Sequence, residues 1–592
     1  MKIVLCHYHL HQGGVSQVVI NQIDSLLSTV SKKGKPVKEI LVLYGDNESH
    51  SLCEKIQRRA QSSIPVHFKN IPELSYDNDN TKNLYFKDRT SLSAASQTLT
   101  QKIIEVLQGF GFKKEETLLH FHNHSLGKNA ALPLAIWLLA IGGSHLILQI
   151  HDFLEDLRPN NFQYLSRVYR NEQSDNLAAL LYPLLPNIHY FTLTDRDRQL
   201  LIKANVPPDA VQTIPNPATE FPPLPSRYES REKLADLFSI PQHCQLILYP
   251  IRAIRRKNLG ELLLWARLAD RGSRHIRFLV TLPPEHEEAS QYPTWKDLIQ
   301  RLQLPVVLET AVPGKLTFHE NLAAADTIIS TSVAEGFGMV FLESWQIERP
   351  LIGRVLPDIG EEFQKAGIIT PYSQKTIDLP VSWLGEKKIK EQLQQIYSQT
   401  CSDYQRPAPS VDWGKFMTDD LVDFGRLPFL LQREILLFLD QEPELSLQIR
   451  QLNPWIDQAL QVAIPSANLH RQAITPKEAF QEKQREVGSK DRRLFQEQKQ
   501  LEQLLEKNRL AIKQNYSLKS IGNRLQAIYT DILASAQPPR KANLKAIKKN
   551  TTQTSSLLDD LLLYSESLPT VSGKVLLDFF LSPDRFYPVR VT

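Results

Sequence analysis

The chain has 592 residues, of which 42% are hydrophobic, so it is long enough to form two or more domains with sizeable cores. Its 69 basic and 65 acidic residues leave a formal net charge of +4, which creates no global field that would commit the protein to nucleic acid. The cysteines (Cys6, Cys53, Cys244 and Cys401) lie far apart, which argues against a zinc site and against a disulfide framework.

The N-terminus lacks the basic, apolar and small-residue regions of a secretory signal, so we expect no export and a cytoplasmic location. Residues 130–150 contain no Lys, Arg, Asp or Glu over about the length that crosses a bilayer. Pro133 and the segment Gly142-Gly143-Ser144 interrupt this stretch. The interruptions predict a buried helix followed by a strand in place of a membrane span.

Apolar strands alternate with amphipathic helical patterns through most of the first part of the chain, as in a doubly wound α/β sheet. The first series of strands is predicted at 1–5, 39–44, 117–122, 145–150 and 189–194, and the second at 245–249, 276–281, 306–309, 327–331 and 350–353. The proline-rich segment 215–225 between the two series is typical of a linker. Two Rossmann-like halves with a cleft between them are therefore expected.

The segment from Glu335 to Glu343, EGFGMVFLE, places two carboxylates eight positions apart around a glycine-rich turn. It follows a predicted buried strand at 327–331, and open α/β sheets bind ligands at the carboxyl ends of their strands. An acid before such a turn can reach a ligand there, and an acid two helical turns further on is expected on the same helix face, within reach of a ribose hydroxyl. The segment predicts a nucleotide-sugar site.

Three further segments of interest precede this one in the chain. Gly13 and Gly14 follow the first strand, where backbone amides can approach an anion. Asn216 lies in an Ile-Pro-Asn-Pro segment at the start of the linker. Arg252 and Lys257 could neutralise a diphosphate, the arginine as a bidentate donor and the lysine as a point charge. Taken alone, a glycine pair is a common turn and a basic run is usually a solvated patch.

In this order the four motifs resemble glycosyltransferase family 4, whose signature is two glutamates separated by seven residues. The resemblance implies an α/β GT-B fold, with two Rossmann-like domains facing a cleft, here followed by a helical C-terminal extension. It implies transfer of a sugar from a nucleoside diphosphate sugar to a hydroxyl acceptor with retention at the anomeric carbon. Front-face substitution is the working mechanism, because no carboxylate suited to a double displacement is identified in the sequence.

The resemblance also divides the chain and assigns residues. The implied organisation is an N-terminal Rossmann-like acceptor-side domain (1–214), a Pro-rich linker (215–229), a C-terminal Rossmann-like nucleotide-sugar domain (230–398), a helical region with the closing helix (399–536), and a flexible connection and tail (537–592). The implied donor-binding residues are Gly13, Gly14, Arg252, Lys257, Glu335, Gly336, Phe337, Gly338, Met339 and Glu343. The implied catalytic residues are His122, Arg252, Lys257 and Glu335.

Histidines are dense near the strand ends of the N-terminal half. The resemblance implies that one of them meets the donor sugar, and His122 aligns best, with His124 as a close competitor. Histidines at a strand end could equally satisfy hydrogen bonds in a polar rim. The residues expected on the acceptor side are His124, Asn129, His151 and Asp152.

Two histidines with Asp152 could in principle form a metal site of the 2-His-1-carboxylate type. The sequence has no HExxH spacing, and the resemblance implies a diphosphate held by basic residues and helix ends. We therefore expect no required metal and no cofactor beyond the nucleotide-sugar co-substrate. The acceptor and the oligomeric state are left open, no nucleic-acid partner is expected, and a membrane surface is not favoured as a partner.

The C-terminal third shows helical spacing at 427–439 and 493–505, with Pro428 suited to a first turn. Residues 515–529 resemble the closing helix of the family, which makes 400–500 an insertion. Residues 537–555 are polar and basic, typical of a flexible connection, and 575–581 are apolar enough to dock on a surface.

Two rival functions stay open. A GT-B phosphorylase would bind inorganic phosphate at Arg252 and Lys257, but Glu343, which suits a ribose, counts against it. A non-catalytic sugar-nucleotide-binding protein is favoured mainly by the long helical C-terminal part, whereas the intact set of motifs favours catalysis.

Overall fold

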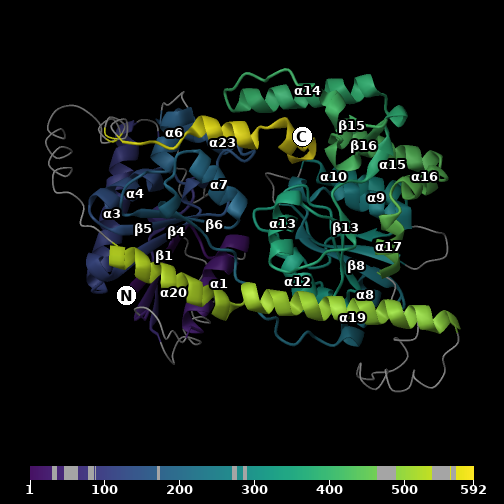
Figure 1. Cartoon of the computed structure of the whole chain (residues 1–592), viewed down its shortest axis with the longest axis horizontal. Helices are drawn as coiled ribbons and strands as arrows, with labels where there is room; N and C mark the ends of the chain where they lie inside the picture. The colour runs from purple at the N-terminus through teal and green to yellow at the C-terminus, as the bar shows by residue number, and fades with distance from the viewer. Residues whose placement is uncertain are drawn as a thin grey trace. The chain divides into compact units, whose positions relative to one another are not determined.

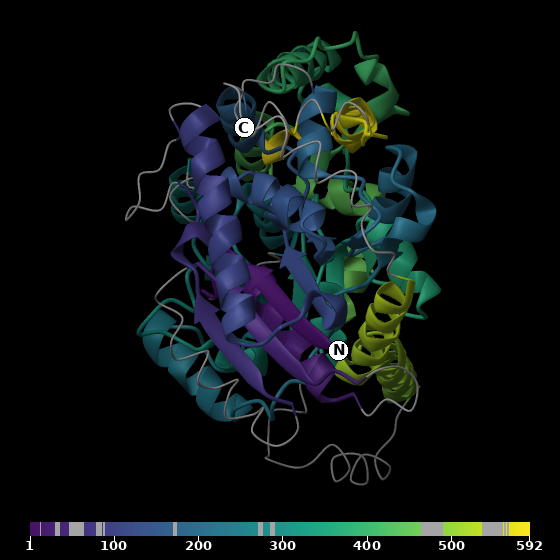
Figure 2. The same ribbon diagram turned by 90° about the vertical axis from the view of Figure 1, so that its left-hand side faces the viewer.

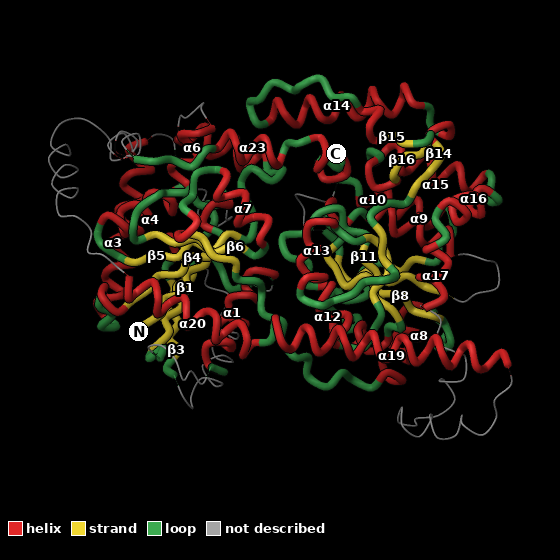
Figure 3. The backbone as a smooth tube through the Cα atoms, in the orientation of Figure 1, coloured by secondary structure: helices red, strands yellow, loops and turns green. Residues whose placement is uncertain are grey.

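The computed structural model describes residues 1–11, 13–29, 36–45, 64–77, 86, 89–169, 174–269, 276–284, 290–462, 489–535, 561, 564 and 568–591. The chain divides into two compact units, which are treated separately below. Unit 1 contains Met1–Thr219, Thr400–Ala408 and Asn515–Arg585, and unit 2 contains Glu220–Gln399, Pro409–Gln514 and Phe586–Thr592. Each unit is built on a parallel sheet flanked by helices (Figure 3).

Unit 1 has a seven-stranded sheet in the order β3-β2-β1-β4-β5-β6-β7, and all its pairings are parallel. Figure 2 shows the first strands of this sheet in purple. The strands are β1 (Lys2–His7), β2 (Glu39–Tyr44), β3 (Val66–Asn70), β4 (Thr117–His122), β5 (His145–Ile150), β6 (Ile188–Thr192) and β7 (Val211–Thr213).

Alternate residues of β1 enter two separate cores, one on each face of the sheet. Val4 and Cys6 belong to the core that includes α3 and α4, whereas Ile3 and Leu5 belong to the core that includes α1 and α20. This split follows from the two-residue period of a strand and requires helices on both faces. The helices of unit 1 are α1 (Gly14–Leu27), α3 (Arg89–Gly109), α4 (Ala131–Ile141), α5 (Pro159–Tyr169), α6 (Ser174–Leu181), α7 (Asp195–Lys203), α20 (Leu518–Ser535) and α23 (Gly573–Phe580).

Helix α20, from the predicted closing region, packs beside α1 on unit 1 (Figure 1). Gly522 allows the close approach, because a Cβ atom there would lie 2.1 Å from the carbonyl oxygen of Ser25. The hydroxyl of Tyr529 lies 2.8 Å from His120 Nδ1 on β4. The apolar tail also docks on unit 1, where α23 packs against α6 and α7 and buries Leu577 and Phe580.

Unit 2 has a six-stranded sheet in the order β10-β9-β8-β11-β12-β13, again parallel throughout. Its strands are β8 (Gln245–Arg252), β9 (Ile276–Leu282), β10 (Val306–Val307), β11 (Thr327–Ser330), β12 (Leu351–Arg354) and β13 (Ser373–Gln374). Its helices include α8 (Arg227–Phe238), α9 (Leu259–Ala269), α10 (Tyr292–Arg301), α11 (Phe318–Ala324), α12 (Val340–Gln346) and α13 (Pro357–Lys365). Helices α14 (Glu386–Asp403) and α19 (Ser489–Asn515) also belong to unit 2, except for their last residues, 400–403 and 515, which belong to unit 1.

A small antiparallel sheet, in the order β14-β16-β15, belongs to unit 2 together with three short helices. These elements are β14 (Asp378–Pro380), β15 (Met417–Thr418), β16 (Leu421–Asp423), α15 (Phe429–Gln441), α16 (Leu445–Leu452) and α17 (Trp455–Val462). The region predicted as helical, 399–536, thus contains the strands β15 and β16 as well. Pro428 precedes α15 as its N-cap and does not enter the first turn, but its carbonyl still accepts the amide of Gln432.

The structure confirms the predicted α/β class, with two parallel sheets and a helical C-terminal region. All ten predicted strands are present, and 39–44, 117–122 and 145–150 have the predicted bounds. Strands β3, β7 and β13 of the parallel sheets and β14, β15 and β16 of the antiparallel sheet were not predicted. The stretch 130–150 forms α4 and β5, and no described helix is long and apolar enough to cross a membrane. The predicted flexible connection at 537–555 lies outside the described residues, as does Cys53.

Candidate active site

The predicted residues of unit 2 gather at one edge of its sheet. Because the strands are parallel, Arg252 at the end of β8, Ser332 after β11 and Arg354 at the end of β12 all lie where the strands end. Glu335 follows Ser332 in the loop before α12, and Lys257 ends the short helical turn Arg255–Lys257 after β8. The sheet thus brings together motifs that are far apart in the chain.

The Glu335 carboxylate is the centre of this group. It accepts hydrogen bonds from the Lys257 ammonium and, at 2.7 Å, from the Ser332 hydroxyl, and Arg256 Nη1 lies 3.4 Å from its other oxygen. Its side chain is 6% exposed. Burial on its own would raise the pKa of Glu335, but the two cations and the hydrogen bonds outweigh burial and lower it. Glu335 is therefore a carboxylate at neutral pH.

Lys257 is held from both its side chain and its backbone. Burial lowers the pKa of its ammonium group, and the charge of Glu335 opposes that effect. Its carbonyl oxygen lies 3.1 Å from the Tyr249 hydroxyl and accepts a hydrogen bond from Thr331 at 2.9 Å. The Tyr249 hydroxyl also lies 2.7 Å from Ser332 Oγ. These contacts tie the loop after β8 to the loop after β11.

The glycine-rich turn has a defined shape. Gly338 adopts φ +83°, in the left-handed region that favours glycine, and a Cβ atom there would lie 2.9 Å from the Phe341 ring. Phe337 is buried and packs edge-on against Phe363, with ring centroids 5.5 Å apart. The Phe337 ring therefore serves the core.

Glu343 lies in the first turn of α12, which begins at Val340. The expectation that Glu335 and Glu343 share a helix face is therefore wrong, because Glu335 precedes the helix. Burial raises the pKa of Glu343 to about 7, and the positive charge of Lys257 opposes the rise. Glu343 thus changes charge near neutral pH.

Arg252 and Arg256 have different partners in the structure. Arg252 donates to the carbonyl of Pro283 at 3.2 Å, while Arg256 is the arginine beside Glu335. The sequence shows a basic run at 255–257, but such a run is usually a solvated surface patch, so Arg256 was not predicted as a site residue. The structure makes Arg256 a candidate site residue together with Tyr249 and Ser332.

The predicted histidines of unit 1 form a buried cluster at the ends of β1, β4 and β5. His122 Nδ1 lies 3.1 Å from His151 Nε2, and the rings of His120 and His122 stack with centroids 4.5 Å apart. Burial lowers the pKa of His122 well below its usual value and that of His151 to about 4. The cluster is therefore neutral at pH 7. Within the described residues, no group of three His, Cys, Asp or Glu side chains is placed to hold a metal.

The other predicted residues of unit 1 have varied surroundings. His124 Nε2 lies 2.8 Å from the Leu181 carbonyl, and the Asn129 amide donates to the carbonyls of Glu73 and Ser75 while its oxygen accepts the amide of Leu132 in α4. Both side chains serve the fold in these contacts. Asp152 is 24% exposed and pairs with Arg158 at 2.8 Å. Gly13 and Gly14 lie at the start of α1, and the adjoining Gln12 is outside the described residues.

The comparisons with known proteins give a curated relative and structural neighbours of low identity. No protein-family model matches the chain. A curated relative, mannosylglucosyl-3-phosphoglycerate synthase of Petrotoga mobilis, is 28% identical over 461 residues, which cover 76% of this chain and 83% of the relative. This relative supports the predicted enzyme class.

Two solved structures share features of the fold at low identity. The crystal structure of Anabaena Alr3699/HepE in complex with UDP and glucose is 16% identical and covers 64% of this chain and 85% of that one, with a TM-score of 0.41. A glycosyltransferase from Rickettsia africae is 13% identical and covers 90% of this chain and 99% of that one, with a TM-score of 0.46. At these values the likeness carries no functional information.

Proposed function

We propose that the protein is a retaining glycosyltransferase of family 4 that moves a sugar from a nucleoside diphosphate sugar to a hydroxyl acceptor. The observation that carries the proposal is the group formed by Lys257, Arg256, Glu335 and Glu343 at the carboxyl edge of the unit 2 sheet. It combines cations for a diphosphate with carboxylates for sugar hydroxyls. The name of the curated relative supports the same class of reaction.

Each residue has a role that follows from its charge. Lys257 and Arg252 stabilise the negative charge that grows on the diphosphate, and Arg256 adds to the same field. Glu335, a carboxylate held by Lys257 and Ser332, accepts from hydroxyls of the donor sugar. Glu343 accepts from the ribose hydroxyls when it is deprotonated.

In the proposed front-face substitution, the bond from the anomeric carbon to the leaving phosphate oxygen breaks while the acceptor oxygen bonds to the same face. The acceptor proton passes to the leaving phosphate. The charges that develop are an oxocarbenium-like ring and a diphosphate. The cations of unit 2 supply the stabilisation for which other enzymes use a divalent ion, so we propose that no metal is required.

The acceptor side is assigned to unit 1, where His122 and His151 adjoin the half-buried Asp152. A carboxylate with one guanidinium partner suits an acceptor that carries hydroxyl groups. The product named for the curated relative is a phosphorylated glycoside, so phosphorylated glycosides come first in an acceptor screen.

Calorimetry with UDP, GDP, ADP and inorganic phosphate tests the proposal. We expect one nucleoside diphosphate to bind, to bind more weakly to Glu343→Ala, and to bind unchanged to Glu391→Ala, whose side chain is 67% exposed on α14. At a hundredfold excess over Kd the bound nucleotide adds about 2.7 kcal/mol to the free energy of unfolding. Phosphate binding without nucleotide binding would indicate a phosphorylase. If neither phosphate nor any nucleotide binds, the proposal is wrong.

The stereochemistry is tested with the donor whose nucleotide binds. Proton NMR of the first product shows whether the anomeric configuration of the donor sugar is kept. Retention is expected, and inversion would overturn the family 4 mechanism. Binding of the nucleotide sugar without transfer or hydrolysis, across the acceptor screen, would favour the non-catalytic alternative.

A further inference from the structure

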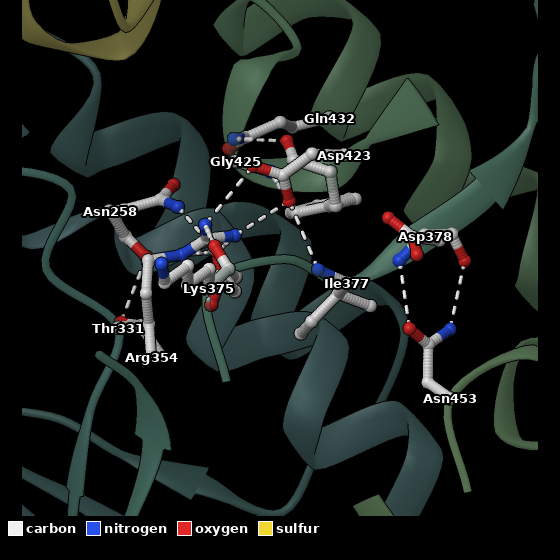
Figure 4. Close-up of polar contacts among 12 residues, drawn as sticks. Asn258, Thr331, Arg354, Lys375, Ile377, Asp378, Asp423, Gly425, Gln432 and Asn453 are labelled. Atoms are coloured by element: carbon white, nitrogen blue, oxygen red, sulfur yellow. Dashed lines mark hydrogen bonds and ion pairs between the residues drawn. The ribbon is translucent and has the colours of Figure 1, made fainter. Parts of the chain in front are cut away.

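Arg354, at the end of β12, is a buried cation held between two carboxylates. Its side chain is 1% exposed, and its Nη2 atom lies 2.7 Å from Glu261 Oε2 on α9. The same atom lies 2.8 Å from Asp423 Oδ1 on β16 (Figure 4). Nε donates a further bond to Glu261 at 2.9 Å, and Nη1 donates to the other Asp423 oxygen at 3.0 Å. The guanidinium therefore makes two-point contacts with both acids, which fix its orientation.

The network around this guanidinium leaves little freedom. Asp423 also accepts the backbone amides of Ile377 at 3.0 Å and Gly425 at 3.1 Å (Figure 4). A Cβ atom at position 425 would lie 2.5 Å from Arg354 Nη2, so glycine is needed for the guanidinium to lie against the backbone. Asp423 at the end of β16 thus presents a carboxylate to Arg354, and Gly425 in the turn after β16 presents a flat backbone surface.

The network reaches the candidate donor site through Asn258. Glu261 Oε2 accepts a hydrogen bond from the Asn258 amide at 2.9 Å, and Asn258 adopts φ +49°, which costs energy for a residue other than glycine. Thr331 donates to the carbonyls of both Lys257 and Asn258, at 2.9 and 3.2 Å. Asn258 directly follows Lys257, so the position of one constrains the other.

Stability is a weak explanation for this triad. Burying two carboxylates and one guanidinium has a large desolvation cost, and apolar residues of similar volume often give equal or greater stability. The Glu261 side chain is 1% exposed, and its burial raises its pKa to about 7 although the charge of Arg354 opposes the rise. A role in geometry accounts for the arrangement better than a role in stability.

We propose that Arg354, Glu261 and Asp423 are positioning residues that act through Asn258 to hold Lys257 in place for the donor diphosphate. This inference rests on the proposed function. It makes the small antiparallel sheet a support of the donor site, although none of its residues carries a predicted role.

Asp423→Asn tests the inference, because it removes one charge and keeps the shape. The probe is whichever of UDP, GDP and ADP binds to the full-length wild type. We expect Asp423→Asn to weaken its binding about tenfold, and to have no further effect in a Lys257→Ala background, since the support acts through that lysine. Full additivity of the two substitutions, or unchanged affinity in Asp423→Asn, would overturn the inference.

Asn258→Gly is the second variant. Glycine adopts φ +49° without strain, so the turn persists while the link to Glu261 is lost. We expect the same loss of affinity with the melting temperature nearly unchanged. Unchanged affinity in this variant would also overturn the inference. Arg354→Lys should also weaken nucleotide binding, because a lysine cannot make the two-point contacts of the arginine. Full activity of Arg354→Lys would contradict the role of orientation.

A matched control lies at the other end of the strands of the same sheet, where they begin. Asp326, directly before β11, is buried and pairs with Arg231 at 2.6 Å. Asp326→Asn should lower the melting temperature as Asp423→Asn does, and leave nucleotide affinity unchanged. Equal loss of affinity in both variants would show a general effect of instability and overturn the inference. If Lys257→Ala alone leaves nucleotide binding intact, the proposed function is wrong. The positioning role of Arg354, Glu261 and Asp423 is then wrong as well.

Discussion

The Lys257 ammonium and the Glu335 carboxylate, which lie 78 residues apart in the chain, are in direct contact at the edge of the unit 2 sheet. Both side chains are largely buried, so removing one partner leaves the other in poorly solvated surroundings. The pair also holds the two charges that the proposed reaction needs, a cation for the diphosphate and an anion for sugar hydroxyls.

This contact predicts opposite effects of two substitutions on nucleotide binding. Lys257→Met should weaken binding of the nucleoside diphosphate, because its cation is lost. Glu335→Gln should leave that binding equal or stronger, since the acid no longer competes for the lysine, yet lower kcat by about a hundredfold through loss of transition-state contacts. Calorimetry and steady-state kinetics measure the two effects. The exposed pair Lys387 and Glu391 on α14 gives control variants that should change neither, and parallel weakening in both test variants would contradict the prediction.

Glu343 predicts a dependence of stability on pH. Its pKa is about 7 in the folded chain and 4.5 when unperturbed, so between these values the folded state binds more protons than the unfolded state. Its contribution to stability is therefore full below about pH 4.5 and is lost as the pH rises through 7. Glu343→Gln should exceed the wild type by on the order of 1–3 kcal/mol at pH 8 and by much less at pH 5. Urea unfolding at both pH values measures the difference.

The same group predicts how nucleotide affinity changes with pH. Wild-type binding should strengthen as the pH rises through 7, because the deprotonated Glu343 accepts from ribose hydroxyls. Glu343→Gln should bind more weakly at pH 8 and show a flatter profile. Calorimetry between pH 6 and 8 tests this prediction. Identical pH profiles for the two proteins would show that Glu343 does not bind the ribose.

The sequence predicted those parts of the fold that have local periodic signals. The strand at 117–122 is apolar except for Thr117 and its two histidines, and its bounds were found from sequence. Strands β15 and β16 have only two and three residues, too few for an alternating pattern. The apolar segment 575–581 indicated docking, but its contact surface on α6 and α7 comes from residues about 400 positions earlier, which no local pattern encodes.

In the candidate site, too, some residues have a local sequence signal and others depend on tertiary contacts. Motif spacing indicated Lys257, Glu335 and Glu343, and the structure brings them to one sheet edge. The role of Arg256 was hidden, because three basic residues in a row resemble a solvated surface until a carboxylate is placed beside one of them. The contact of Arg354 with Asp423 joins two sheets and depends on tertiary packing alone.

The turn between the two glutamates predicts a steric effect. Gly338→Ala places a Cβ atom 2.9 Å from Phe341 at φ +83°, so both backbone strain and overlap are introduced. Gly314→Ala is the matched control, because Gly314 has φ +82° and nothing within 4 Å of the added atom. We expect Gly338→Ala to lose about 1–3 kcal/mol more than the control in urea unfolding, and to weaken nucleotide binding. Equal losses would show that strain alone matters there.

The closing helix predicts a local effect on unit 1. In Gly522→Ala the added methyl group would lie 2.1 Å from the Ser25 carbonyl oxygen and 2.3 Å from Thr29 Oγ1, so α20 must move away from α1. Overpacking of this kind costs about 1–3 kcal/mol, whereas Gly109→Ala, in the last turn of α3 with nothing within 4 Å, should be neutral or slightly stabilising. Hydrogen exchange read by mass spectrometry should be faster in peptides from α1 and α20 and unchanged in peptides from β8. Unchanged exchange in α1 would show that α20 does not contribute to the stability of unit 1, although the Tyr529 hydroxyl lies 2.8 Å from His120.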